Sequence, residues 1–399
     1  MKYEATDVDA DQSKEGSING KEPNNLNQSS QHVENGGIKF ELYQQTDRFG
    51  FIKQHSDGEY YNSVTYLPLN VIRTREKKWL DMLDNWPYYM NKNFDKVKER
   101  CRKGIPPSIR PRAWRYLCGA EFYMTNPQTK DCFKLSLLVC HFSTLESSAQ
   151  VLDANAHNSR WKEDIAKDIF RQFPDHELFS REGVYGKLGQ EDLLRLLQAW
   201  TVMQPDEGYC QGQAPIAAAL LMQMPVEDAF YCFVQICQRY LPGYYSPGLE
   251  AIQLDGDILF ALLRRHSYSS YKHLKKHSID PVLYMIEWFM CAFCRTLPWP
   301  SVLRVWDMFF CEGVKVLFKV ALVLFKYGLS TRDQLNQCPS MYETVERLKN
   351  LPPHIMQEDF LIKKIIELNV TDDELERIHY KQSKVRNSKQ SFKSHLPFK

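Results

Sequence analysis

Two short polar stretches of this 399-residue chain hold the side chains best suited to chemistry. The first, IAKDIFR, ends in Arg171, and the second, GYCQG, carries Gln211 between two glycines. A fixed cation can stabilise the charge that develops on a phosphoryl group during transfer, and a fixed amide can orient the attacking water. Arginine and glutamine side chains supply these two groups, so the pair could together assist phosphoryl transfer to water.

Each stretch also has a purely structural interpretation. On a helix, Asp164, Asp168 and Arg171 would share one face. A solvent-exposed aspartate–arginine pair on that face would stabilise the helix by only roughly 0.2–0.5 kcal/mol. GYCQG could be an ordinary turn between two helices, with Tyr209 tucked into the core. Taken alone, each stretch favours its structural interpretation, whereas the two together favour chemistry.

The elements that must position these stretches are helices. Apolar residues recur at three- and four-residue spacing in the segments from about 70 to 365, without sustained strand alternation. Trp161, Ile165 and Ile169 form a stripe opposite the polar face, which predicts that Arg171 lies in the last helical turn before Pro174. The segment QAPIAAALLMQM, after GYCQG, is apolar nearly all round and predicts a buried helix. The predicted fold class is all-α.

The two ends of the chain differ in composition from its middle. Residues 1–37 are rich in Asn, Ser, Gln, Gly and acidic groups, and we expect them to be disordered because they cannot bury enough apolar surface to offset their ordering entropy. Residues 38–97 are expected to form an extension that packs on a helical core at 98–370. Residues 371–399 are interpreted as a basic tail, either a solvated, disordered end or a segment weakly attracted to anionic lipid headgroups.

Composition and missing motifs exclude several functions. A formal net charge of +2 gives no reason to expect a nucleic-acid partner. The most apolar stretches, 281–293 and 316–329, are shorter than the roughly 20 residues of a spanning helix and contain charges, so we expect buried helices there. There is no P-loop, GxSxG or HExxH sequence, and we expect neither a cofactor nor a metal ion of the protein's own.

The 11 cysteines are scattered and odd in number, which indicates reduced thiols of the cytosol. Cys291 and Cys294 form one CxxC pair. Such a pair could be half of a zinc site or a redox pair, but no second pair stands at zinc-ribbon spacing. We interpret the two cysteines as small apolar residues on a buried helix.

Taken together, the two polar stretches resemble the motifs of the TBC-domain Rab GTPase-activating proteins. The segments KGIPPSIRPRAW before them and RVWDMFFCEG after them are also similar, so the motif core covers about 104–313. YLPGYYSPGLEAIQLDG and DPVLYMIEWFM resemble the subfamily whose mammalian members bind PDZ scaffolds of the ezrin-linked cortex. The family's motifs read IxxDxxR and YxQ followed by Gly, here Ile165, Asp168 and Arg171, then Tyr209, Gln211 and Gly212.

The resemblance implies a V-shaped, all-helical domain in two helical subdomains that acts on a GTP-bound Rab. Arg171 would be an arginine finger, and Gln211 a glutamine finger that replaces the Rab's own switch glutamine. The protein would therefore be an activator rather than a stand-alone enzyme, acting on Mg-GTP bound to its partner. Asp168 would orient the arginine, and Tyr209 would support the glutamine loop. The other supporting positions implied by the resemblance are Ile165, Gly212, Trp306 and Asp307.

The resemblance also implies a place of action and a set of partners. The protein would regulate vesicle traffic from the cytosol, recruited to endosomal, vesicle or plasma-membrane surfaces. The alternatives are a Rab-binding effector without catalysis and a helical interaction scaffold. Lys399 at the C-terminus does not suit a PDZ pocket, so a PDZ scaffold is not expected as a partner. Rab specificity lies in surface side chains that the motifs do not encode.

Overall fold

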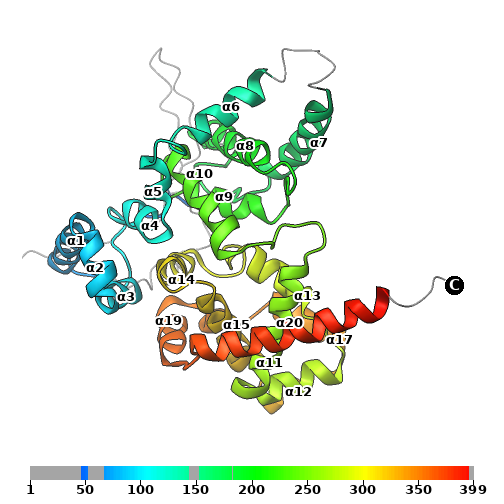
Figure 1. The fold of residues 1–399 in the computed structure, drawn as a ribbon. Coiled ribbons are helices and arrows are strands. Elements are labelled where there is room, and N and C mark those ends of the chain that lie inside the picture. Colours follow the sequence, from blue (N-terminus) through cyan, green and yellow to red (C-terminus); the bar gives the residue numbers. More distant parts are fainter. Residues whose placement is uncertain (1–45, 53–66, 143–151, 182, 395–399) are drawn as a thin grey trace, which may run out of the picture. The chain divides into compact units, whose positions relative to one another are not determined.

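The computed structural model describes residues 46–52, 67–142, 152–181 and 183–394 (Figure 1). The segment 1–37, predicted to be disordered, lies outside these residues. The described elements are helices, and the extended pairing in the described ranges consists of isolated antiparallel bridges that join Thr46 with Ile52 and Phe51 with His176. The all-α prediction is therefore confirmed.

A first group of helices comes from the predicted extension and its junction with the core. Trp79, Met82 and Leu83 of the first helix are buried, and the third helix packs against α14 (Trp299–Glu312). The helices of this group are α1 (Leu69–Asp84), α2 (Trp86–Lys92) and α3 (Phe94–Arg102).

A second group surrounds α8 (Gly186–Met203), which packs against α6, α7, α9 and α10. Leu193, Leu196, Leu197 and Trp200 of α8 are fully buried, as their helical spacing predicts. Every residue of α9 (Gln213–Leu221) is buried, which confirms the prediction for the apolar segment after GYCQG. The other helices of this group are α4 (Arg110–Cys118), α5 (Ala120–Thr125), α6 (Cys132–Phe142), α7 (Leu152–Ile169) and α10 (Val226–Gln235), the last continued by the π-helix η1 (Ile236–Tyr240).

A third group is built on α11 (Glu250–His266), α14 and α15 (Lys315–Gly328). Among the described helices, none is long and apolar enough to cross a membrane. The remaining helices of this group are α12 (Tyr268–Lys276), α13 (Val282–Met285), α16 (Arg332–Asn336), α17 (Met341–Lys349), α18 (Pro353–Met356), α19 (Glu358–Glu367) and α20 (Asp372–Ser394), with the π-helix η2 (Ile286–Met290) after α13.

The carboxylate of Asp307 ties α14 to the start of α4. It is fully buried and accepts hydrogen bonds from the Ile105 backbone N–H (2.8 Å) and the Trp114 indole N–H (2.9 Å). The Arg110 guanidinium Nε lies 3.0 Å from the same carboxylate, and its Nη2 donates to the Ile105 carbonyl. A buried charge needs such partners to offset its lost hydration. This network holds the GIPPSIRPRAW segment in place, and α4 in turn packs on α10.

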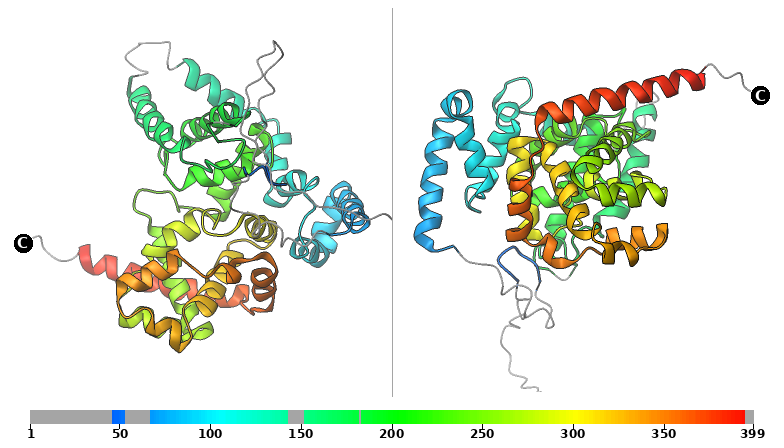
Figure 2. Two further views of the ribbon diagram at one scale, coloured as in Figure 1. Left: turned by 180° about the vertical axis from the view of Figure 1, so that it is seen from behind. Right: turned by 90° about the horizontal axis from the view of Figure 1, so that it is seen from below.

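The basic segment is helical through Ser394, which contradicts one of its two interpretations, that of a disordered end. Helix α20 runs through Ser394 and packs along α11, where Figures 1 and 2 draw it in red. Polar contacts join the two helices: Arg386 has its Nε 2.7 Å from Asp257 and its Nη2 2.8 Å from the Gln253 carbonyl, and Glu374 near the start of α20 pairs with Arg265 of α11 at 2.7 Å. The charge pattern alone did not indicate that these basic residues have acidic and carbonyl partners on α11.

The apolar stretch at 281–293 is not one buried helix. Four residues of α-helix pass into η2, and the chain then turns at Cys291. Cys291 and Cys294 are buried as expected, but they lie in this turn, where Ala292 and Phe293 adopt positive φ angles of 43° and 60°. Burial raises the pKa of the Cys291 thiol to about 12, which keeps it protonated and unreactive at neutral pH.

Candidate functional site

The arginine predicted from IxxDxxR lies just beyond a helix end. Helix α7 ends at Ile169, so the expectation that Arg171 occupies the last helical turn is wrong by two residues. A turn continues the chain there, because the Arg171 backbone N–H donates to the Asp168 carbonyl at 3.3 Å. The Gln172 side-chain amide donates to the same carbonyl at 2.8 Å, and Phe173 follows with a φ of 40°. The arginine side chain therefore projects from a hydrogen-bonded turn rather than from a helix surface.

Asp168 joins the two predicted motifs. Its side chain is only 9% exposed, and one carboxylate oxygen, Oδ1, forms an ion pair with Nη2 of Arg171. The other oxygen, Oδ2, accepts a hydrogen bond of 2.6 Å from the Tyr209 hydroxyl. Both oxygens thus have strong partners, one charged and one neutral. The structural alternative of a fully exposed aspartate–arginine pair does not describe this carboxylate.

Tyr209 acts as a neutral donor in this arrangement. Its ring is buried, and burial together with the negative charge of Asp168 raises the pKa of its phenol far above the usual range. The hydroxyl therefore keeps its proton at any physiological pH and points it at Asp168. The tyrosine ring is part of the core, as the structural interpretation proposed. Its hydroxyl also contacts Asp168, the carboxylate that pairs with Arg171.

Gln211 lies directly beside Arg171. The surrounding donors and acceptors assign the amide orientation in which its oxygen faces the guanidinium. In that orientation the oxygen accepts hydrogen bonds from both Nη atoms, at 3.2 Å from Nη1. Gln211 is exposed and the Arg171 side chain is 48% exposed, so both end groups reach solvent. The fold thus brings the predicted cation and the predicted amide together on the surface.

The loop that carries Gln211 is held by packing on both sides. Gly208 has a φ of 66°, and a Cβ atom there would lie 2.4 Å from the Trp161 ring. The Gly208 carbonyl accepts from the Trp200 indole N–H at 3.0 Å, and the Cys210 backbone N–H donates to Oε1 of the buried Gln213 at 2.9 Å. These contacts fix the backbone on each side of Gln211.

Gly212, the second glycine, approaches a neighbour within the chain. A Cβ atom there would meet Cβ and Cε of Met290 at 3.1 Å, which is tighter than ordinary van der Waals contact. Tyr245 donates to the Met290 carbonyl at 3.0 Å and so restrains that neighbour. The glycine therefore allows close packing against η2, and a larger residue would have to displace the Met290 side chain slightly.

Other predicted residues lie in the core or away from the site. Ile165 is a fully buried residue of α7, and Trp306 donates from its indole N–H to the Ala292 carbonyl at 2.9 Å. Asp307 belongs to the α4–α14 network described above. Asp164, expected on the same face as Arg171, pairs with Lys167 at 3.3 Å instead. These residues position helices, and the described contacts do not bring them to Arg171 or Gln211.

Two residues beside the site were missed by sequence reasoning. Phe170 is 52% exposed, and the Arg181 guanidinium lies over its ring at 5.5 Å from the centroid. Burial raises the pKa of Glu207, whose Oε1 has no hydrogen-bond partner among the described residues. Phe170 follows the buried Ile169 directly in the sequence, and a single apolar residue at that position gives no signal that it is exposed.

Within the described ranges, no cluster of three or more His, Cys, Asp and Glu side chains could hold a metal. The arrangement offers a cation and an amide in contact at the surface, with the exposed Phe170 next to the cation in the chain. Such a surface can contribute groups to a reaction centre carried by another molecule.

Solved structures share this fold. The TBC domain of the Chlamydomonas flagellar RabGAP aligns with a TM-score of 0.57 at 24% identity, covering 80% of this chain and 98% of that one. The Ypt/Rab-GAP domain of Gyp1p aligns with a TM-score of 0.58 at 20% identity, covering 74% and 97%. The fold is thus that of TBC domains.

Sequence comparison extends the likeness from fold to family. Residues 107–331 match the Rab-GTPase-TBC domain. The chain is 52% identical to mouse TBC1 domain family member 10A over 334 residues, which cover 84% of this chain and 62% of that protein. It is 44% identical to the Drosophila TBC1 domain family member whacked, covering 80% and 82%. The chain belongs to the Rab-GTPase-TBC domain family. It spans 62% of the length of mouse member 10A and 40% of mouse member 10B.

Proposed function

We propose that this protein accelerates GTP hydrolysis by a Rab-family GTPase, with Arg171 and Gln211 supplied in trans. The observation that carries the proposal is the contact between the Arg171 guanidinium and the Gln211 amide on one exposed surface. The cation would stabilise the charge on the transferring phosphoryl group, and the amide would orient the attacking water. Magnesium and nucleotide would belong to the Rab.

The electrostatics of Asp168 support this division of roles. The carboxylate holds the guanidinium by one oxygen while Tyr209 occupies the other, so the arginine is oriented without being buried. The Arg171 side chain is 48% exposed, so it is open to solvent while the buried Asp168 holds it. Arg171 can therefore exchange part of its contact with Asp168 and Gln211 for a phosphoryl group. Orientation before binding reduces the entropy lost when the partner arrives.

The family and the surface support a proposal for the substrate and the setting. A GTP-loaded Rab is the partner, and the exposed ring of Phe170 beside Arg171 gives it an apolar contact. We propose that the protein acts in vesicle traffic and meets its Rab at membrane surfaces. An effector without catalysis would bind the same Rab but would not require the arginine's charge.

Single-turnover GTP hydrolysis against a panel of Rab proteins tests the proposal. The wild-type chain should accelerate at least one Rab, and Arg171→Ala should lose about 10³-fold or more of that acceleration. Binding to the GTP-loaded Rab should change far less, because the arginine acts mainly on transition-state charge.

Arg195→Ala is a matched control for Arg171→Ala. Arg195 is 49% exposed and pairs with Asp192 three residues earlier at 2.9 Å, which repeats the spacing and exposure of the Arg171 pair away from the site. It should keep wild-type activity. Equal activity of Arg171→Ala and wild type on the responsive Rab would contradict the catalytic role and favour the effector.

A further inference from the structure

A pocket of about 330 Å³ lies between α1 and α3, apart from the residues of the candidate site. Asn70, Val71 and Thr74 from the first turns of α1 line it, and so does Trp79, which is buried. The loop after α3 closes it at Gly104. This volume is within the range of small-molecule sites, roughly 300–1,000 Å³.

The charged lining of this pocket is almost entirely cationic. The chain as a whole is nearly balanced, with 51 basic and 49 acidic residues. The pocket, in contrast, has five cationic side chains and a single carboxylate, Glu99. The five are Arg75 and Lys78 from α1, Lys96 and Arg100 from α3, and Lys103 just after α3. All lie around one small volume, so their potentials add within about one Debye length of 8 Å.

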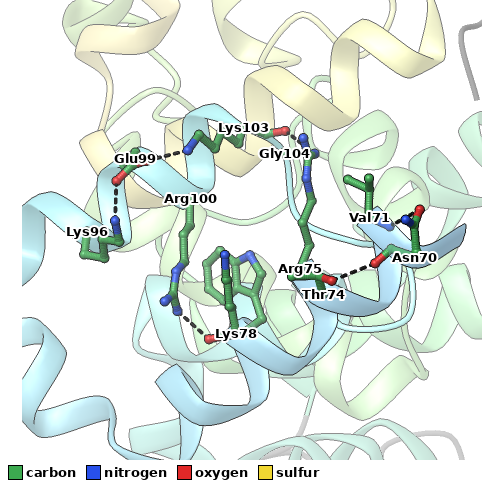
Figure 3. Close-up of a pocket in the computed structure, with 11 residues that line it drawn as sticks. Asn70, Val71, Thr74, Arg75, Lys78, Lys96, Glu99, Arg100, Lys103 and Gly104 are labelled. Atoms are coloured by element: carbon green, nitrogen blue, oxygen red, sulfur yellow. Dashed lines mark hydrogen bonds and ion pairs between the residues drawn. The ribbon is translucent and has the colours of Figure 1, made fainter. Parts of the chain in front are cut away.

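The lining holds these cations without neutralising them. Arg75 Nη1 donates to the Lys103 carbonyl at 2.9 Å, and Arg100 donates to the Lys78 carbonyl (Figure 3). Carbonyl groups orient the guanidinium groups but leave their net charge in place. In the part of the chain that the structure describes, the Lys78 ammonium has no acidic partner within ion-pair distance.

Glu99 is shared between two lysines. Its carboxylate lies 2.9 Å from the Lys96 ammonium and also pairs with Lys103, as Figure 3 shows. Hydrogen bonds from Lys103 and Lys96 lower the pKa of Glu99 to about 2. The single negative charge of Glu99 is shared between two positive charges. With five cations and one carboxylate, the side chains that line the pocket carry a net charge of +4.

The backbone at the pocket's edge is fixed to the core. Gly104 has a φ of 88°, and a Cβ atom there would lie 2.6 Å from Nε of Arg304 on α14. The next residue, Ile105, donates its N–H to the buried Asp307. Because this edge is anchored, the backbone and the carbonyl of Lys103 are held in place beside the pocket.

We propose that this pocket binds a polyphosphorylated small anion of the inositol phosphate class, either free or as the headgroup of a membrane lipid. Lysine and arginine side chains are the usual phosphate ligands of proteins. Several phosphate groups on one small ring match several cations around one pocket, whereas a single carboxylate would balance only one of them. A nucleotide is disfavoured, because the one aromatic lining residue, Trp79, is buried and presents no face to a base.

The first experiment measures binding of inositol hexakisphosphate to the full chain by calorimetry. The pocket variant Lys78→Gln with Lys103→Gln should bind at least about tenfold more weakly than wild type. The control variant Arg73→Gln with Lys77→Gln removes the same charge from exposed positions of α1 that do not line the pocket. It should bind within about twofold of wild type.

Glu99→Gln provides a test in the opposite direction. It removes the only carboxylate of the pocket and frees Lys96 and Lys103, so binding should become several-fold tighter. A folding defect would not produce this gain. Absence of hexakisphosphate binding to wild type, equal losses in the pocket and control variants, or unchanged binding in Glu99→Gln would each overturn the proposal.

Vesicles identify the source of the anion. One set contains phosphatidylcholine with phosphatidylinositol 4,5-bisphosphate, and the other contains phosphatidylserine at equal total charge. If the protein binds the phosphatidylinositol 4,5-bisphosphate vesicles and the Lys78→Gln with Lys103→Gln variant does not, the ligand is the lipid headgroup. If these lysines affect only the binding of soluble inositol hexakisphosphate, the ligand is a free inositol phosphate. Equal binding to both sets of vesicles, with equal losses in the pocket and control variants, would show that a diffuse basic surface binds them. That result would overturn the proposal.

Discussion

Tyr209 and Asp168 are 41 positions apart in the chain, and the phenol of the first donates a 2.6 Å hydrogen bond to the carboxylate of the second. The same carboxylate pairs with Arg171 through its other oxygen. The tyrosine of one motif thus helps to orient the arginine of the other. This hydrogen bond makes the two motifs one structural unit.

Tyr209→Phe keeps the buried ring and removes the hydroxyl. We expect the stability to fall by about 1–3 kcal/mol, because Asp168 loses a donor in a buried position. Stimulated GTP hydrolysis should also fall about tenfold or more, since a misplaced catalytic group loses much of its effect.

Tyr231→Phe is the control: the Tyr231 hydroxyl donates to the Thr129 and Lys130 carbonyls at 2.9 and 2.6 Å, away from the site. Thermal unfolding and single-turnover hydrolysis separate the two effects. Equal hydrolysis rates in both variants would show that Tyr209 has only a structural role.

Gln211→Ala should lose most of the stimulation of a normal Rab, because the water-orienting amide is gone while Arg171 remains. Gln211→Asn should be impaired as well, since it shortens the reach by one methylene and catalytic geometry tolerates about 1 Å of error poorly. Gln223→Ala is the control, because the Gln223 amide donates to the neighbouring Met222 carbonyl, and this variant should be unaffected.

A Rab variant tests the same role of Gln211 from the other side. A Rab whose own switch glutamine is changed to leucine should still be stimulated by wild-type protein if Gln211 supplies the amide. Full activity of Gln211→Ala on normal Rab, together with loss of response in the Rab variant, would reduce GYCQG to a structural turn.

Gly208→Ala should destabilise the glutamine loop more than a comparable glycine substitution elsewhere. The positive φ alone costs a non-glycine residue about 1–2 kcal/mol. At Gly208 the new Cβ would also lie 2.4 Å from the Trp161 ring, so the loop or α7 must shift. Gly243→Ala has a similar φ of 72° but meets no atom nearer than 3.4 Å. The melting temperature and the hydrolysis rate should both fall further for Gly208→Ala. Equal losses in the two variants would show that the contact with Trp161 is unimportant.

Truncation before Lys381 should lower stability, because it removes Arg386 from α11. The Arg386 guanidinium contacts Asp257 at 2.7 Å and the Gln253 side chain and carbonyl at 3.1 and 2.8 Å. Arg386→Gln should reproduce a loss of about 1 kcal/mol, whereas the exposed Lys381→Gln should not. Hydrolysis measured well below the melting temperature should stay unchanged. An unaltered melting temperature in Arg386→Gln would show that α20 does not depend on this contact.

The sequence by itself determined the fold class and the chemical nature of the candidate site. Three- and four-residue apolar spacing is a local property, so α8 and α9 could be predicted from their own residues. The residue types of Arg171 and Gln211, and the motifs that contain them, likewise indicated from the sequence alone a cation and an amide that act together.

The tertiary structure alone decided how those residues meet. The end of α7 at Ile169, the burial of Asp168 and the contact of Arg171 with Gln211 depend on neighbours distant in the chain. The same holds for the cation pocket between α1 and α3 and for the docking of Arg386 on α11. Helical periodicity reports which face of a segment is apolar, but it does not report which other segment covers that face. Charges that look solvated in the sequence, such as Arg100 of α3 and Arg386 of α20, therefore obtained their distant partners only when the helices packed.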